Sequence, residues 1–225
     1  MGYLIFILPA FILSIYAQFK VKSTFNKYSQ VRSSRGHTGS DAAATILRRN
    51  GMSGQVGIEA VAGTLTDHYD PSARKLRLSD GVYGANSIAA IGVAAHEVGH
   101  AIQHNQQYAP LTLRNSIVPI TNFASTASFP ILLIGFFLQN MNFVMIGIIL
   151  FSAVVLFHMV TLPVELNASR RAVVQLSEAG IISDGEVPMV KKVLGAAALT
   201  YLAATLSAIA NLLYYLMIFS GGNDE

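Results

Sequence analysis

Long stretches without charged residues dominate the polar and apolar pattern of the chain, and they predict membrane helices. Residues 1–19, 115–164 and 193–223 contain no Asp, Glu, Lys or Arg. A helix that spans the hydrocarbon core of a bilayer requires about 20 mostly apolar residues. The longest stretch has room for two spans, because the polar patch at 139–142 can form a turn between them. We therefore predict four transmembrane helices, over residues 2–20, 116–138, 142–164 and 196–219.

The segments between these spans carry patterns typical of a small α+β unit. A short helix is expected at 42–49, with Ser40 and Asp41 as its cap. Strands are expected at 56–62, 63–69 and 75–79, with a turn signal at 70–73. A β-hairpin would therefore lead into an apolar helical run at 88–95, and either 63–67 or 75–79 could offer an edge to an extended peptide.

These patterns predict a mainly α-helical integral membrane protein that carries a small α+β unit with a β-hairpin. We expect residues 1–225 to form a single domain, with catalytic segments at 21–115 and 165–195. A mean hydropathy of +0.49 with only 12% charged residues argues against an ordinary soluble protein.

The basic residues indicate an orientation in the membrane. All 15 Lys and Arg residues lie either at 20–114, from the end of the first predicted span to the start of the second, or at 170–192, after the third. With four spans, both regions are on one side, and the positive-inside rule makes that side the cytoplasm. We therefore expect a protein of the bacterial cytoplasmic membrane with both termini outside. The basic residues are scattered rather than striped, so no nucleic-acid partner is expected.

The sequence His96-Glu97-Val98-Gly99-His100 predicts a catalytic zinc site. Residues four apart on a helix share a face, so both imidazoles can reach one ion, and Glu97 would lie beside a water in the open coordination position. The chain contains no cysteine, which removes thiolate ligands and disulfides from consideration.

A zinc ion with an open catalytic position needs a third protein ligand. Glu165 is the strongest candidate, because it follows the third predicted span on the same side of the membrane as the two histidines. His104 cannot join His96 and His100 around one ion on a straight helix, and we expect it near the site. His158 lies inside a span, where ionisable groups are costly and often functional. The other residues considered are His37, Asp67 and His68.

The chain resembles a known family at three segments: 65–70, 94–103 and 162–172. They are similar to those of bacterial neutral zinc metallopeptidases of YugP type, over almost the full chain. More distantly the chain resembles the HtpX heat-shock proteases and the CAAX prenyl proteases. This resemblance implies His96, His100 and Glu165 as Zn²⁺ ligands and Glu97 as catalytic base. The distant relatives have an aspartate that supports a zinc histidine, and the corresponding residue here is Ser169.

We expect a membrane endopeptidase that uses a zinc-bound water to hydrolyse peptides or membrane proteins at the cytosolic surface. His158, Arg170 and Arg171 are candidate donors to the oxyanion. One alternative is an intramembrane protease of the site-2 class, although the predicted spans contain no aspartate for its usual ligand. Another is a zinc-binding scaffold without turnover. The substrate and the oligomeric state do not follow from the sequence.

Overall fold

The computed structural model describes residues 2–221, with side chains from residue 7 onward, and it is mainly helical. Its contacts group into two compact units, one of residues 1–17, 109–163 and 200–225, and one of 18–108 and 164–199. Helices α1 (Gly2–Ser29), α6 (Met141–Glu178) and α7 (Val187–Gly221) contribute a segment to each unit. The prediction of a single domain stays a prediction.

The first unit consists of long apolar helices. Helix α5 (Ala109–Phe137) and the first part of α6 form a hairpin whose turn lies at 138–140, where the polar patch predicted it. At this turn Gln139 has a φ of 50°, and the Asn142 N–H donates to Oδ1 of Asn140. The hairpin packs closely, because a Cβ atom on Gly135 would lie 2.7 Å from the backbone nitrogen of Val144.

Among the described residues, three helices are long and apolar enough to cross a membrane: α5, α6 and α7. Four transmembrane helices are therefore not confirmed. The predicted span 2–20 is helical as part of α1, but the structure describes its side chains only from residue 7, and lysines begin at Lys20. This described apolar part is shorter than the roughly 20 residues that a span requires.

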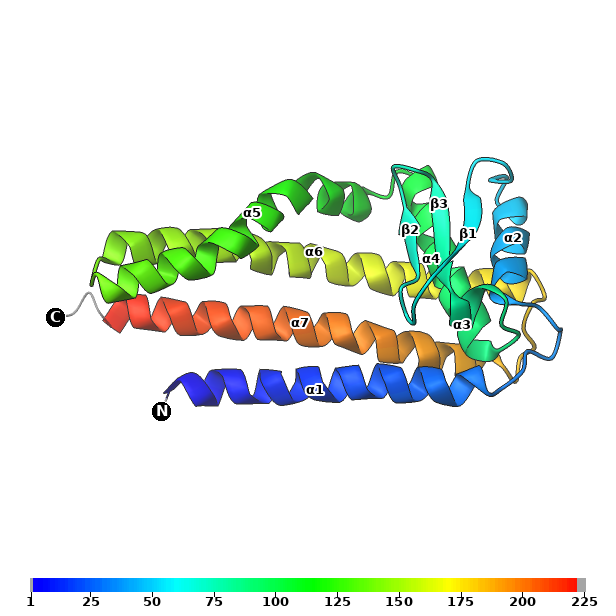
Figure 1. The fold of residues 1–225 in the computed structure, drawn as a ribbon, viewed down its shortest axis with the longest axis horizontal. Helices are drawn as coiled ribbons and strands as arrows, with labels where there is room; N and C mark the ends of the chain where they lie inside the picture. Colours follow the sequence, from blue (N-terminus) through cyan, green and yellow to red (C-terminus); the bar gives the residue numbers. More distant parts are fainter. Residues whose placement is uncertain (1, 222–225) are drawn as a thin grey trace. The chain divides into compact units, whose positions relative to one another are not determined.

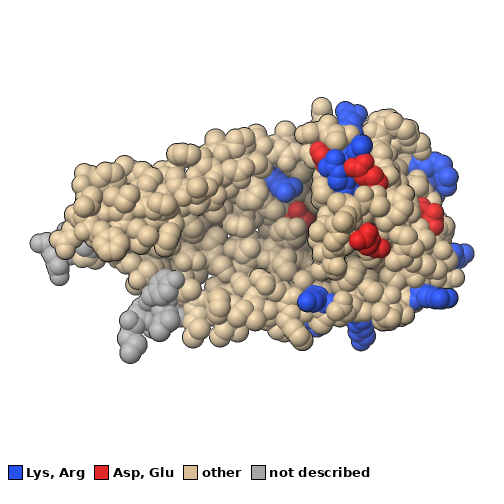
Figure 2. All heavy atoms as spheres, viewed as in Figure 1, with Lys and Arg blue, Asp and Glu red and all other residues tan. Residues whose placement is uncertain are grey.

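Charged residues belong almost entirely to the second unit. Arg114 is the only Lys, Arg, Asp or Glu among the described residues of the first unit. On the face drawn in Figure 2, the blue and red spheres accordingly gather over the elements of the second unit, and the long apolar helices are mostly tan. Large apolar side chains such as Phe123 and Phe137 are exposed on the first unit, a surface that is typical of membrane contact.

A three-stranded sheet lies in the second unit, with strand order β1-β3-β2 (Figure 1). Strand β3 (Lys75–Ser79) pairs in parallel with β1 (Gly57–Val61) and in antiparallel fashion with β2 (His68–Asp70). The predicted hairpin is therefore β2–β3. The expected peptide-docking edges were wrong, because β3 is the central strand and residues 63–67 form a loop rather than a strand. Leu65 has a φ of 57° within this loop, a conformation that interrupts an extended strand.

The core of this unit surrounds α4 (Ile88–Asn105), which is buried over most of its length. Small residues such as Ala90, Ala94 and Ala101 let neighbouring elements approach it closely. Helix α3 (Asp80–Tyr83) precedes α4, and Ser87 caps α4 by accepting the N–H of Ala90. Helix α2 (Gly39–Arg49) begins earlier than predicted, because Thr38 and Asp41 form its capping box instead of Ser40.

A buried carboxylate, Glu186, joins the segment after α1 to the start of α7. Its side chain is 7% exposed and accepts hydrogen bonds from the backbone and hydroxyl of both Ser34 and Ser183, at 2.7–2.8 Å. Burial alone would raise the pKa of Glu186, but the backbone N–H donors of Ser183 and Ser34, together with the two hydroxyls, lower it to about 2.

Replacing Glu186 by Gln is expected to lower the thermal unfolding temperature in detergent by several degrees at pH 7. A carboxylate with a depressed pKa stabilises the fold fully above the unfolded value near 4.5, and this contribution of up to about 3 kcal/mol is lost as the pH falls towards 2. The difference in unfolding temperature between wild type and variant should therefore shrink between pH 4.5 and 2. Glu178→Gln, at an exposed position, is the control. A difference independent of pH would contradict the role of the charge.

A candidate metal centre on two helices

The two histidines of the HExxH sequence lie on one face of α4. The centroids of the His96 and His100 rings are 4.8 Å apart, and the rings are nearly perpendicular at 86°. Both side chains are partly exposed, whereas Glu97 between them is 8% exposed. The helix thus presents two imidazoles at its surface and holds the intervening carboxylate in a mostly desolvated position.

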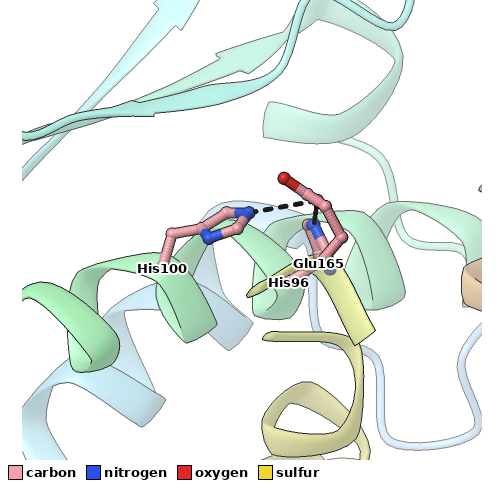
Figure 3. A group of neighbouring side chains, drawn as sticks. All are labelled: His96, His100 and Glu165. Atoms are coloured by element: carbon pink, nitrogen blue, oxygen red, sulfur yellow. Dashed lines mark hydrogen bonds and ion pairs between the residues drawn. The ribbon is translucent and has the colours of Figure 1, made fainter. Parts of the chain in front are cut away.

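Glu165 on α6 meets these two histidines. Its Oε2 atom lies 3.2 Å from Nε2 of His96 and 3.4 Å from Nε2 of His100, and the side chain is almost fully buried (Figure 3). Ligands about 2.05 Å from a tetrahedral zinc ion are about 3.3 Å from one another, so both distances fit one ion. Two imidazole nitrogens and a carboxylate oxygen are also donor types that zinc accepts.

This group is distinctive within the described part of the chain. Among the described residues, His96, His100 and Glu165 are the one group of three or more His, Cys, Asp or Glu residues that could hold a metal ion. Their ligand atoms all lie within 4.8 Å of one another. The three residues are therefore positioned to bind a metal ion, as the sequence led us to expect.

Gly99 allows α4 and α6 to approach closely enough for this convergence. A Cβ atom on Gly99 would lie 2.7 Å from the carbonyl oxygen of Ala168 and 3.1 Å from its Cα atom. Contacts of that length to backbone atoms cannot be relieved by a side-chain rotation, so the helices would have to separate. Because Gly99 lies between the two histidines and Ala168 follows Glu165 by three positions, this contact brings the ligands from the two helices together.

Hydrogen bonds at the far nitrogens orient both rings. The hydroxyl of Ser169 lies 3.1 Å from Nδ1 of His96, and Oε1 of Gln103 lies 3.0 Å from Nδ1 of His100. An amide oxygen only accepts, so Nδ1 of His100 carries a proton, and Nε2 is the nitrogen whose lone pair can bind a metal when the ring is neutral. Ser169 therefore contacts His96 as predicted from the resemblance to the distant relatives, which have an aspartate at this position, but it supplies no charge.

Gln103 was not recognised from the sequence as part of the site. Its side chain is completely buried, and its amide nitrogen donates to the Val164 carbonyl and to Oδ1 of Asn167, each at 2.9 Å. These two acceptors fix the amide orientation that faces His100. Gln103 therefore connects α4 to the turn of α6 that carries Glu165. The signal in the sequence was its position three residues after His100, on the same face of the helix.

Arg171 extends this network rather than pointing to a reacting group. Its Nε atom donates to Oδ1 of Asn167 at 2.7 Å, and its Nη1 atom donates to Gln106 at 2.7 Å. The guanidinium also lies over the Tyr108 ring, 5.8 Å from the centroid. These contacts hold Asn167, and through it Gln103, in place.

The remaining candidates from the sequence lie outside the metal-ligand group. His104 pairs with Tyr69 of β2, whose hydroxyl lies 2.8 Å from Nδ1 of His104. Asp67 accepts hydrogen bonds from the backbone and hydroxyl of Ser79, at 2.7 and 2.9 Å. Nδ1 of His68 lies 2.8 Å from the carbonyl oxygen of Thr66.

Two further histidines and one arginine have other surroundings. His37 precedes α2 in a loop, and His158 lies on the part of α6 that belongs to the unit of apolar helices. Arg170 is exposed on α6 and lines a groove described below. None of these three belongs to the ligand group.

The electrostatic surroundings of the site favour a cation. Burial disfavours the protonated form of His100, but the hydrogen bond to Glu165 and the charges of Glu97 and Glu165 outweigh it and raise the pKa of His100 above its ordinary value. The same two carboxylates that favour a proton on this ring favour a divalent ion between the three side chains.

Comparison with known proteins agrees with the geometry of this site. Residues 3–220 match a family described as "Putative neutral zinc metallopeptidase", and the chain belongs to this family of zinc metallopeptidases. It is also 53% identical over 213 residues to the "Putative membrane protease YugP" of Bacillus subtilis (strain 168), covering 95% of this chain and 94% of that relative. No solved structure matches the chain.

Replacing Gln103 by Met is expected to weaken zinc binding about 10- to 100-fold while most of the volume is kept. The substitution removes the acceptor that orients His100 and leaves the Val164 carbonyl without its donor. Competition with a chromophoric chelator measures the affinity. Gln55→Met, at an exposed loop position, is the matched control. A folded Gln103→Met protein with unchanged zinc affinity would contradict the positioning role.

Proposed function

We propose that this protein is a zinc-dependent endopeptidase that hydrolyses peptide bonds at the cytosolic surface of the membrane. The observation that carries the proposal is the convergence of His96, His100 and Glu165, next to the desolvated carboxylate of Glu97. Membership of a zinc metallopeptidase family and the similarity to a membrane protease support it.

In this proposal the Nε2 atoms of His96 and His100 and the carboxylate of Glu165 hold the ion. The distances of 3.2 and 3.4 Å from Glu165 to the two imidazoles support this set. The hydrogen bond from Nδ1 of His100 to Oε1 of Gln103 supports the required tautomer of that ring, and Ser169 orients the ring of His96. Zinc, when bound, supplies a Lewis acid that polarises the scissile carbonyl and lowers the pKa of a coordinated water.

Glu97 is proposed to be the general base and then the general acid. Its carboxylate takes a proton from the attacking water and delivers it to the nitrogen of the leaving amine. The position of Glu97 between the two proposed ligands on α4, at 8% exposure, supports this role. Ser169 and Gln103 hold the rings of His96 and His100 in orientation during these transfers.

Two alternative functions receive less support. An intramembrane protease of the site-2 class would place the HExxH helix in the bilayer, whereas α4 lies in the core of the sheet-containing unit and is not among the helices able to span a membrane. A zinc-binding scaffold would have no use for a carboxylate at Glu97. We therefore place catalysis first.

The proposed location is the bacterial cytoplasmic membrane, with the metal centre in the cytoplasm. The similarity to a membrane protease and the three membrane-capable helices support membrane insertion. The gathering of the described charged residues in the sheet-containing unit supports the orientation through the positive-inside rule. A peptide or membrane-protein substrate would approach from that side.

Glu97→Gln is expected to keep an equimolar amount of zinc and to lower kcat about 10²- to 10⁴-fold, because the amide cannot accept the proton. Metal analysis of the purified protein and cleavage of a fluorogenic peptide library measure the two effects. Glu165→Gln and His100→Ala are the matched variants and should lose zinc together with activity. Unchanged cleavage by Glu97→Gln would remove it as the base, and retention of zinc by both ligand variants would refute the assigned site.

The absence of natural cysteine allows a direct test of orientation. Single cysteines introduced at Ser72, in the turn after β2, and at Asn142, in the turn between α5 and α6, report opposite sides of the membrane in this proposal. In intact cells a membrane-impermeant maleimide should label Asn142→Cys and not Ser72→Cys, and permeabilised cells should show both. The reverse pattern in intact cells would place the metal centre outside.

A further inference from the structure

Two grooves flank the beginning of α7, and each combines cations with apolar side chains. The groove between α6 and α7 has a volume of about 400 Å³, and Arg170 and Lys191 face it across an apolar lining that includes Leu166 and Val173. The groove between α1 and α7 has a volume of about 510 Å³, and Lys20, Lys27 and Lys192 line it together with Leu199. Gly195 belongs to both grooves.

The charge of these grooves is of one sign. Neither lining contains an Asp or Glu residue. The ion pairs found in the described part of the chain involve Glu59, Asp70 and Glu165, and none of them neutralises a groove cation. An anionic ligand would therefore meet uncompensated positive charge in both places.

Measured from the predicted span ends, Arg170 and Lys191 would lie at the depth of a lipid headgroup. Arg170 is six positions beyond the predicted end of a span at residue 164, and Lys191 is five positions before the predicted start of the next at 196. At 1.5 Å per residue these offsets are about 7–9 Å, against a headgroup layer of about 5–8 Å on each side of the hydrocarbon core. Flexible basic side chains cover the small difference. Leu166 and Ala198, in contrast, lie within two residues of the predicted span ends.

We propose that these grooves bind anionic phospholipid. The lipid phosphate would lie between Arg170 and Lys191 in one groove and among Lys20, Lys27 and Lys192 in the other. Its acyl chains would cover the apolar part of the lining, including Leu166 and Leu199. The positive charge selects an anionic headgroup, and the apolar lining next to it selects a lipid over a free anion. This proposal does not depend on the peptidase reaction.

The test uses the full-length protein in a neutral detergent and fluorescent phosphatidylglycerol as the probe. Arg170→Gln combined with Lys191→Gln should weaken binding at the groove between α6 and α7 about 10- to 30-fold, since each basic residue at an anionic membrane surface contributes about a fivefold factor. The groove between α1 and α7 keeps its three lysines, so about half of the high-affinity probe binding should remain. The matched control is Arg48→Gln with Arg49→Gln, which removes the same charge from exposed positions of α2. The control should bind the probe like the wild type. Equal loss in both double variants would overturn the proposal in favour of diffuse surface charge.

A second variant removes the space instead of the charge. Nothing lies within 4 Å of a Cβ atom built on Gly195, so Gly195→Leu starts a side chain in open space at the residue that lines both grooves, and it also removes a glycine from a helix. It should fold at least as stably as wild type and bind phosphatidylglycerol at least tenfold more weakly. Wild-type binding by Gly195→Leu would overturn the proposal, including where the charge variant does not fold.

Competition separates a lipid from a free anion. Unlabelled phosphatidylglycerol should displace the probe at micromolar concentration, whereas phosphatidylcholine and inorganic phosphate should do so at concentrations at least tenfold higher. Displacement by inorganic phosphate as effective as that by phosphatidylglycerol would show a simple anion site and overturn the assignment to lipid.

Discussion

Three donor atoms from two helices must lie little more than 3 Å apart for this protein to hold a metal, and much of the sheet-containing unit serves that requirement. Residues His100 and Glu165 are far apart in sequence, so the contact between α4 and α6 replaces the proximity that the chain does not provide. Burial in the core fixes the position of α4. Gln103 of α4 then holds α6 in place, because it donates hydrogen bonds to Val164 and Asn167 that a small shift of either helix would break.

The buried polar atoms at this contact between α4 and α6 are paired with one another, which lowers the free-energy cost of removing them from water. Buried polar atoms cost free energy unless they are paired, and here each ring Nδ1 atom has a partner in Ser169 or Gln103. The carboxylate of Glu165 is paired with the Nε2 atoms of His96 and His100, at 3.2 and 3.4 Å. These three atoms are also the ones positioned to bind a metal ion.

The sequence predicted that His96, His100 and Glu165 would lie together, because their chemistry is visible in residue types and in the spacing of apolar stretches. His96 and His100 follow from one helical turn, and Glu165 follows from the number of spans that return the chain to the same side. The strand order could not be predicted in the same way, because the parallel pairing of β1 with β3 depends on contacts across the loop that contains Leu65. Gln103 was missed because a neutral amide does not titrate and is not a usual zinc ligand, although its spacing from His100 was available.

The contact at Gly99 changes how the zinc-binding motif should be interpreted in this chain. A pattern written as two histidines and a glutamate leaves the fourth position open to any amino acid. Here that position faces the backbone of Ala168 at a distance that admits only a hydrogen atom. Every missense change at the Gly99 codon would introduce a side chain. This position, which the HExxH pattern leaves open, is therefore as restricted as the two histidines of the motif.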